Sequence, residues 1–220
     1  MNTAGKATFE SEAEELANSI THGLGFVLSV VGWGVLMVLA WLFGDGWHLV
    51  SCGIYGGTLV FLYAASTCYH TVRKPRTKRV LRILDHAAIF LLIAGTYTPF
   101  TMVFLRDGIG WTLLALVWGI AVVGLLFKIF SRRRFHWGTT ALYLLMGWLS
   151  VLFIKPVLEA VPLGALLWLA AGGLAYTIGV VFYGWRSLRF SHAIWHVFVL
   201  LGSISHYVAV LIYVVPGAGQ

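Results

Sequence analysis

Seven long apolar runs follow one another along this chain, and this pattern restricts its fold more than any other feature. A helix that crosses the hydrocarbon core of a bilayer needs about 20 mainly apolar residues. Only short polar or basic breaks separate the runs. We therefore predict an all-α, polytopic membrane protein, a seven-transmembrane-helix bundle that forms a single integral membrane domain over residues 1–220. A short N-terminal segment at 1–17 precedes helices expected at about 18–43, 48–70, 85–105, 110–130, 137–157, 163–185 and 192–215.

The charge content excludes several classes of soluble protein. Only 10% of the residues are charged and 60% are hydrophobic, whereas a soluble domain has about 25% charged and about 45–50% apolar residues. Too few charges remain to cover a surface that faces water. This excludes an ordinary soluble enzyme, a disordered chain and a nucleic-acid-binding module, despite the formal net charge of +7.

The lysines and arginines are distributed unevenly between the two sides of the predicted bundle. Thirteen of the 15 fall in the N-terminal segment or in the connections after the second, fourth and sixth helices. Only Arg106 and Lys155 fall on the other side. Because cytoplasmic loops carry an excess of Lys and Arg, we predict that the N-terminus is cytoplasmic and the C-terminus lies outside. The bases then face anionic inner-leaflet lipid, so the positive charge requires no nucleic acid.

Ionisable residues gather at one end of the predicted helices. Such residues are costly at membrane depth and mark functional sites. On the predicted topology, four helices bring them to the same level near the cytoplasmic face. The first helix contributes His22, the second ends at His70, the third begins with Asp85 and His86, and the seventh begins with His192 and His196.

Three of these histidines form a candidate metal site. His192 and His196 are four residues apart, so both side chains leave one face of a helix, about 6 Å apart along its axis. This spacing can present two nitrogen ligands to one metal. His70, at matching depth, is the third candidate. Three imidazoles with an open fourth position are typical of catalytic zinc, and no cysteine is placed to join them, so Zn²⁺ is the predicted cofactor.

Ser66 and Asp85 are the candidate catalytic residues beside that metal. Ser66 lies one turn before His70 and could contact water or a ligand at the metal. Asp85 could accept a hydrogen bond from that water, act as a general base, or orient a ligand histidine. Each has a simpler alternative: Asp85 directly precedes an apolar run and would make a good N-cap, and Ser66 could bond back to its own helix.

Other residues of these types have structural interpretations. A single histidine near a helix end, such as His22, is more often an interfacial hydrogen-bonding group than a ligand. His206 lies about 15 Å deeper than His196 along its helix, which favours a buried hydrogen bond between helices. Gly53 and Gly57 have the GxxxG spacing, which is typical of close helix packing.

Several motifs occur in a fixed order along the chain. They are residues 14–23 (EELANSITHG), 66–70 (STCYH), 85–90 (DHAAIF) followed by 95–99 (GTYTP), and 192–196 (HAIWH). Together they resemble the signature motifs of the progestin and adiponectin receptor family, whose bacterial branch is called hemolysin III. The motifs cover nearly the whole chain, and their combination in this order is highly specific.

The resemblance implies a seven-helix bundle in the bacterial inner (plasma) membrane, with zinc bound near the cytoplasmic side. It matches His70, His192 and His196 to the family's zinc ligands, and it places Ser66 and Asp85 beside the metal and its water. The family and its wider superfamily are associated with metal-dependent hydrolysis of lipid amides such as ceramides, and with sensing of membrane lipid state. This chain has a short N-terminal segment and minimal outer loops, so the resemblance does not extend to binding a protein hormone. A uniformly hydrophobic seven-helix chain also does not fit a secreted pore-former.

Three functions are compatible with these observations. The first is a zinc-dependent lipid amide or ester hydrolase in membrane lipid homeostasis, with a membrane lipid as its substrate or ligand. The second is a non-catalytic sensor of membrane state, in which a structural zinc joins the second and seventh helices and an unidentified protein partner reads the signal. The third is an ion or proton transporter. The clustering of ionisable groups at one end and the lack of an inverted repeat argue against transport.

Overall fold

The computed structural model describes residues 11–106, 108–130, 136–185 and 187–215. Within these ranges all regular secondary structure is helical, and seven segments are long and apolar enough to cross a membrane. The predicted all-α chain with seven membrane-length segments is therefore confirmed. The helices are α1 (Glu12–Phe43), α2 (Gly46–Thr71), α3 (Pro75–Val103), α4 (Gly108–Phe130), α5 (His136–Gly147), α6 (Ile154–Ala160), α7 (Leu163–Gly184) and α8 (Ser191–Ala209).

The fifth and seventh segments are not uniform α-helices. A short 3₁₀ helix at Leu149–Phe153 joins α5 to α6, so these elements together form the fifth segment. A π-helical turn at Val210–Val214 extends α8. Residues 1–10 of the expected N-terminal segment and the basic residues at 132–134 lie outside the described ranges.

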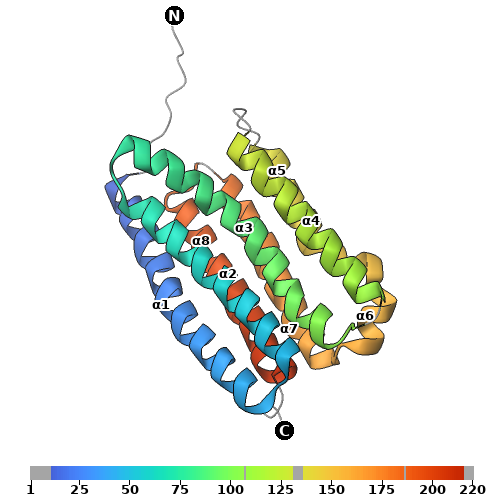
Figure 1. Ribbon diagram of the computed structural model, residues 1–220. Helices are drawn as coiled ribbons and strands as arrows, with labels where there is room; N and C mark the ends of the chain where they lie inside the picture. The colour runs from blue at the N-terminus through green and yellow to red at the C-terminus, as the bar shows by residue number, and fades with distance from the viewer. Residues whose placement is uncertain (1–10, 107, 131–135, 186, 216–220) are drawn as a thin grey trace, which may run out of the picture.

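The first and last membrane segments are in contact, which brings distant parts of the sequence together. Successive helices α1 to α4 pack side by side, α7 packs on α8, and α8 also contacts α1 (Figure 1). The α5 helix contacts α3, α4 and α7. As a result, α1, α2 and α8 are neighbours although α8 lies at the other end of the sequence.

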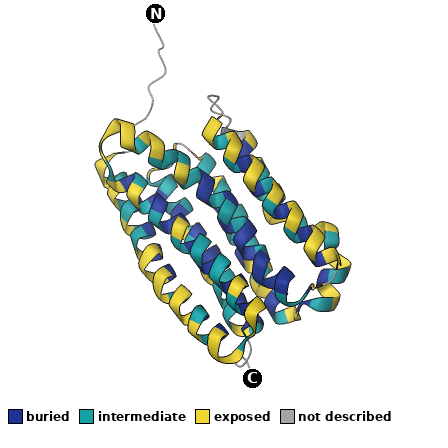
Figure 2. Ribbon diagram, viewed as in Figure 1, coloured by how far each residue is buried: buried dark blue, intermediate teal, exposed yellow. Residues whose placement is uncertain are grey.

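The α1 helix shows the polarity pattern expected of a protein in lipid. Its buried stripe consists of polar and small residues over most of its length, whereas its outer face is apolar (Figure 2). This is the reverse of a helix on a soluble protein, which turns its apolar face inward. The buried residues are Asn18, His22, Gly25, Ser29, Leu36 and Ala40, at helical spacing.

Two helices begin earlier than expected. The α1 helix begins at Glu12, about six residues before the expected start, because Ser11 and Glu14 form a capping box. The α3 helix begins at Pro75, ten residues early, with proline in the first turn where its missing N–H is not needed. Asp85 therefore lies well inside α3, and the N-cap alternative for this residue is wrong.

Asp45 makes several polar contacts at the end of the bundle opposite to the start of α1. Its carboxylate caps α2 by accepting hydrogen bonds from the backbone N–H groups of Trp47 and His48, and it pairs with Arg106 at 3.1 Å. Desolvation raises the pKa of Asp45, but the hydrogen bonds from His48 and Arg106 outweigh it and lower the pKa to about 2. The stabilisation from this charge is therefore present above the unfolded value of about 3.9 and is lost as the pH falls through about 2.

Close helix packing uses different glycines from those in the predicted GxxxG pair. A Cβ atom added at Gly57 would meet nothing within 4 Å, and one at Gly53 would meet only Met37, at 3.7 Å. The α1–α2 approach instead depends on Gly56, where a Cβ atom would overlap the Trp33 ring. The packing interpretation of Gly53 and Gly57 is therefore wrong.

Gly172 makes a similar close contact between α7 and α8, so Gly172→Ala is expected to destabilise the protein. The added methyl group would overlap the His206 ring, which would have to give up its hydrogen bond to the Leu169 carbonyl. We expect a loss of about 1–3 kcal/mol of stability, measured as a lower thermal midpoint in detergent. Gly57→Ala, where space is open, is the matched control and is expected to be neutral or slightly stabilising. Equal midpoints for the two variants would contradict this packing.

Candidate metal centre

Three histidine rings converge where α2 ends and α8 begins. His70 comes from the last turn of α2, and His192 and His196 come from the start of α8. One nitrogen from each ring can be chosen so that all three lie within 4.8 Å of one another. His70 and His196 are buried, and His192 is half-buried. The structure therefore brings together the three residues predicted as ligands, in an arrangement that could bind a metal ion.

The start of α8 is set by a residue of α1. Phe190, just before α8, has a left-handed backbone with φ of 57° and provides no side-chain cap. Its backbone N–H donates to Glu14 Oε1 at 3.0 Å. Glu14 thereby joins the first turn of α1 to the turn that begins α8, and so it helps to fix the depth of His192.

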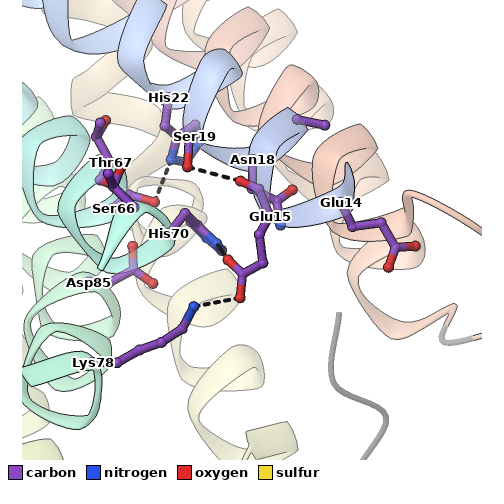
Figure 3. Close-up of polar contacts among 12 residues, drawn as sticks. Glu14, Glu15, Asn18, Ser19, His22, Ser66, Thr67, His70, Lys78 and Asp85 are labelled. Atoms are coloured by element: carbon purple, nitrogen blue, oxygen red, sulfur yellow. Dashed lines mark hydrogen bonds and ion pairs between the residues drawn. The ribbon is translucent and has the colours of Figure 1, made fainter. Parts of the chain in front are cut away.

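A carboxylate orients His70. Nδ1 of His70 lies 2.8 Å from Glu15 Oε2 and must donate, because a carboxylate only accepts (Figure 3). The other oxygen of Glu15 accepts a hydrogen bond from Lys78 at the start of α3. Nε2 of His70 is then the nitrogen with a free lone pair, and it is buried without a hydrogen-bond partner among the described residues. A metal ion would provide the missing partner, so these residues fit a metal.

His22 belongs to the same cluster. Its ring stacks on His196, with 3.4 Å between ring centroids and 13° between planes, and its Nδ1 shares a hydrogen bond of 2.6 Å with Ser66 Oγ. Both His22 and Ser66 are buried. His22 is therefore a hydrogen-bonding residue outside the candidate ligand group, as its position in the sequence predicted, and Ser66 contacts α1 through His22. His196 contacts α1 a second time, with its Nδ1 3.3 Å from Thr21 Oγ1.

Asp85 lies on the wall of a cavity next to the histidines. The cavity has a volume of about 140 Å³ and extends along α3 from Asp85 to Tyr97 and along α8 from His192 to His206. By helix geometry, the α8 side is about 21 Å long. Asp85 Oδ2 is 3.5 Å from Nδ1 of His86. Most of the remaining lining is aliphatic or aromatic, and it includes Leu62, Ile89, Leu92, Ile93, Leu144, Val180, Trp195 and Val199.

His206 lies at the deep end of this cavity. Its Nε2 is 3.1 Å from the Leu169 carbonyl on α7, so Nε2 donates and the contact joins α8 to α7. The predicted hydrogen bond between helices is confirmed.

The sequence predicted no role for Glu15 or Lys78, and for His22 it predicted hydrogen bonding but not its contact with His196. A usable signal was present for two of them. Glu15 and His22 are seven residues apart, and Asn18 lies between them at helical spacing, so all three share one face of α1. A polar face on a lipid-embedded helix indicates an inward orientation. Lys78 gave no such signal, because it is one of several bases in the same segment.

These features define a multi-pass membrane protein of seven helical segments with a buried histidine triad that could bind a metal ion. The chain belongs to the haemolysin-III related family, whose sequence model matches residues 11–207. The resemblance inferred from the motifs is confirmed.

Similar proteins occur in bacteria and in animals. The chain is 45% identical over 205 residues to Hemolysin-3 of Bacillus cereus, which covers 93% of this chain and 94% of that protein. It is 44% identical over 202 residues to the Hemolysin-3 homolog of Bacillus subtilis (strain 168), covering 92% and 95%. It is 29% identical over 206 residues to the human Monocyte to macrophage differentiation factor, covering 91% and 84%. No solved structure gave a significant match.

Metal analysis of the purified protein tests the triad. We expect about one metal ion per chain in the wild type, because three imidazoles converge on one point. His196→Asn, which removes one ligand and keeps a polar side chain, is expected to lose the metal. His48→Asn, at the opposite end of α2, is the control and is expected to retain it. A metal-free wild type, or full retention in His196→Asn, would contradict the site.

Proposed function

We propose that this protein is a zinc-dependent hydrolase of lipid amides or esters in the bacterial inner membrane. The proposal rests on one cavity. His192, His196 and Asp85 together line one end of this long, largely apolar space. Metal ligands, a carboxylate and room for an acyl chain are thus combined in one place. A soluble metabolite would not require such a lining, whereas a lipid tail would.

The donor set favours zinc. All three candidate ligands are imidazoles, and neither cysteine belongs to the cluster. Zinc bound by three histidines would polarise a carbonyl group and lower the pKa of water to about 7. The His22 ring of α1 stacks on His196, and the Ser66 hydroxyl of α2 holds the His22 ring by a hydrogen bond.

Asp85 is the proposed general base. Its carboxylate lies on the cavity wall with His192 and His196, and it takes the proton from the water that attacks the substrate carbonyl. It then delivers this proton to the leaving nitrogen or oxygen. Ser66, predicted as a second catalytic residue, acts in this proposal through His22 rather than on the substrate.

Hydrolysis by the purified, zinc-loaded protein tests this function. We expect release of fatty acid from a panel of fluorescent ceramides and acyl esters. Asp85→Asn is expected to lower turnover by about 10²-fold or more, because it removes the proton acceptor. Its zinc content is expected to remain that of the wild type, since the triad is intact.

Glu159→Gln is the matched control for Asp85→Asn. Glu159 is an exposed carboxylate on α6, outside the cavity lining, and its variant is expected to retain full turnover. Absence of turnover in the zinc-loaded wild type across the panel would overturn the hydrolase proposal. Equal turnover in wild type and Asp85→Asn would overturn the role of Asp85.

The structure also offers support for a non-catalytic sensor with structural zinc. Glu14 and Glu15 already tie α1 to the start of α8 and to the end of α2, so a metal at the triad would complete a clasp between these helices. In that case zinc removal lowers the thermal midpoint, no lipid product forms, and deletion of the gene changes membrane lipid composition or fluidity. The hydrolysis assay separates the two functions.

We also propose that the triad faces the cytoplasm. Thr77 and Glu159 are exposed positions at the two ends of the bundle. In a variant with Cys52→Ser and Cys68→Ser, Glu159→Cys is expected to react with a membrane-impermeant maleimide in intact spheroplasts. Thr77→Cys is expected to react only after lysis. The reverse pattern would contradict the orientation predicted from the basic loops.

A further inference from the structure

We propose that Glu15 is a positioning residue of the metal centre: it fixes the ring of His70 and raises its affinity for the metal. This inference rests on the metal-binding part of the proposed function and is independent of the reaction. It gives a role to a residue that neither contacts the metal position nor lines the cavity.

The geometry around Glu15 leaves its carboxylate little freedom. One oxygen accepts from His70 Nδ1 at 2.8 Å and the other from Lys78 Nζ, so residues of α2 and α3 both hold it (Figure 3). The His70 side chain is 1% exposed, and those of Glu15 and Lys78 are 25% and 27% exposed. Both bonds are therefore shielded from most of the solvent and link three helices.

This bond selects the nitrogen that His70 offers to a metal. With the proton held on Nδ1 by the carboxylate, Nε2 is left as the lone-pair nitrogen, and it is the buried atom without a hydrogen-bond partner. A carboxylate on the far nitrogen of a ligand histidine fixes its tautomer and ring orientation and increases its basicity. Loss of such a partner typically lowers metal affinity about 10–100-fold.

The other buried member of the triad is supported differently. His196 Nδ1 faces the Thr21 hydroxyl at 3.3 Å and the His196 ring stacks on His22, so its support is neutral. His70 is supported by a charge. A hydrogen bond to a charged acceptor is about twice as strong as one between neutral groups. We therefore expect metal affinity to depend strongly on Glu15.

The first turn of α1 contains another carboxylate, Glu12, which serves as the control for Glu15. Glu12 also pairs with a base from the α2–α3 connection, Arg73, but at 3.6 Å and with both side chains almost fully exposed, at 89% and 88%. An exposed pair of this kind contributes little to stability. Glu12→Gln thus removes a carboxylate of the same helix turn without touching the histidines.

The experiment measures metal affinity and stability separately on the full-length protein in detergent. Chelator-treated protein is titrated with Zn²⁺ against a competing fluorescent chelator, and Co²⁺ absorption reports the ligand geometry. Glu15→Gln, which keeps the shape but loses the charge, is expected to bind Zn²⁺ about 10–100-fold more weakly and to give an altered Co²⁺ spectrum. Glu12→Gln is expected to match the wild type in both measurements.

The possible outcomes separate this inference from the proposed function. Wild-type affinity in Glu15→Gln, with or without a lower melting temperature of the metal-free protein, would overturn the positioning role and leave the metal site standing. A wild type that binds no Zn²⁺ would overturn the metal site itself. If Glu15→Gln does not fold, Lys78→Met provides the test, because it frees one oxygen of Glu15 and is expected to weaken Zn²⁺ binding several-fold. Unchanged affinity in a folded Lys78→Met variant would then count against the proposal.

Discussion

The bilayer interior offers no water to hydrogen-bond a polar group, and the arrangement of this molecule follows from that constraint. The polar side chains of α1 therefore face inward, and their partners come from α2, α3 and α8 rather than from solvent. His22 meets Ser66, Glu15 meets His70 and Lys78, and Glu14 meets the backbone of Phe190. Apolar contacts distinguish helix faces poorly in lipid, because lipid tails are as apolar as leucine. These directed polar contacts specify how the helices pair, and the histidine cluster is built from the same contacts.

The α1 helix thus has a function beyond spanning the membrane. It supplies none of the three candidate ligands, yet it contacts the elements on both sides of the triad. A carboxylate reaches His70, a hydroxyl and an imidazole reach His196, and a second carboxylate reaches the turn before α8. A candidate metal site formed by histidines on two helices is thus supported by a third helix.

The sequence predicted the membrane class and the seven segments because hydropathy is a local property. It also predicted the convergence of His70, His192 and His196, because the order of the segments places these residues at the same end of their helices. It failed where the outcome depended on distant partners. Asp85 resembled an N-cap because the basic stretch before it did not look helical, but Pro75 begins α3 earlier and carries that stretch into the helix. Gly53 and Gly57 matched a packing motif, yet the rotation of α2 brings Gly56 against Trp33 instead. The role of Glu15 depends on contacts 55 and 63 residues away along the chain, which no local pattern encodes.

The bond from Phe190 to Glu14 joins residues 176 positions apart, and it has a consequence for biogenesis. The turn before α8 has no side-chain cap of its own, and α8 follows α1 to α7 in the chain. Helix α2 enters the membrane with His70 in place, but the other two candidate ligands, His192 and His196, arrive only with α8. The nascent chain must therefore keep a charged, imidazole-bearing surface on its early helices until α8 docks. A truncated chain that lacks α8 consequently retains only one of the three candidate ligands.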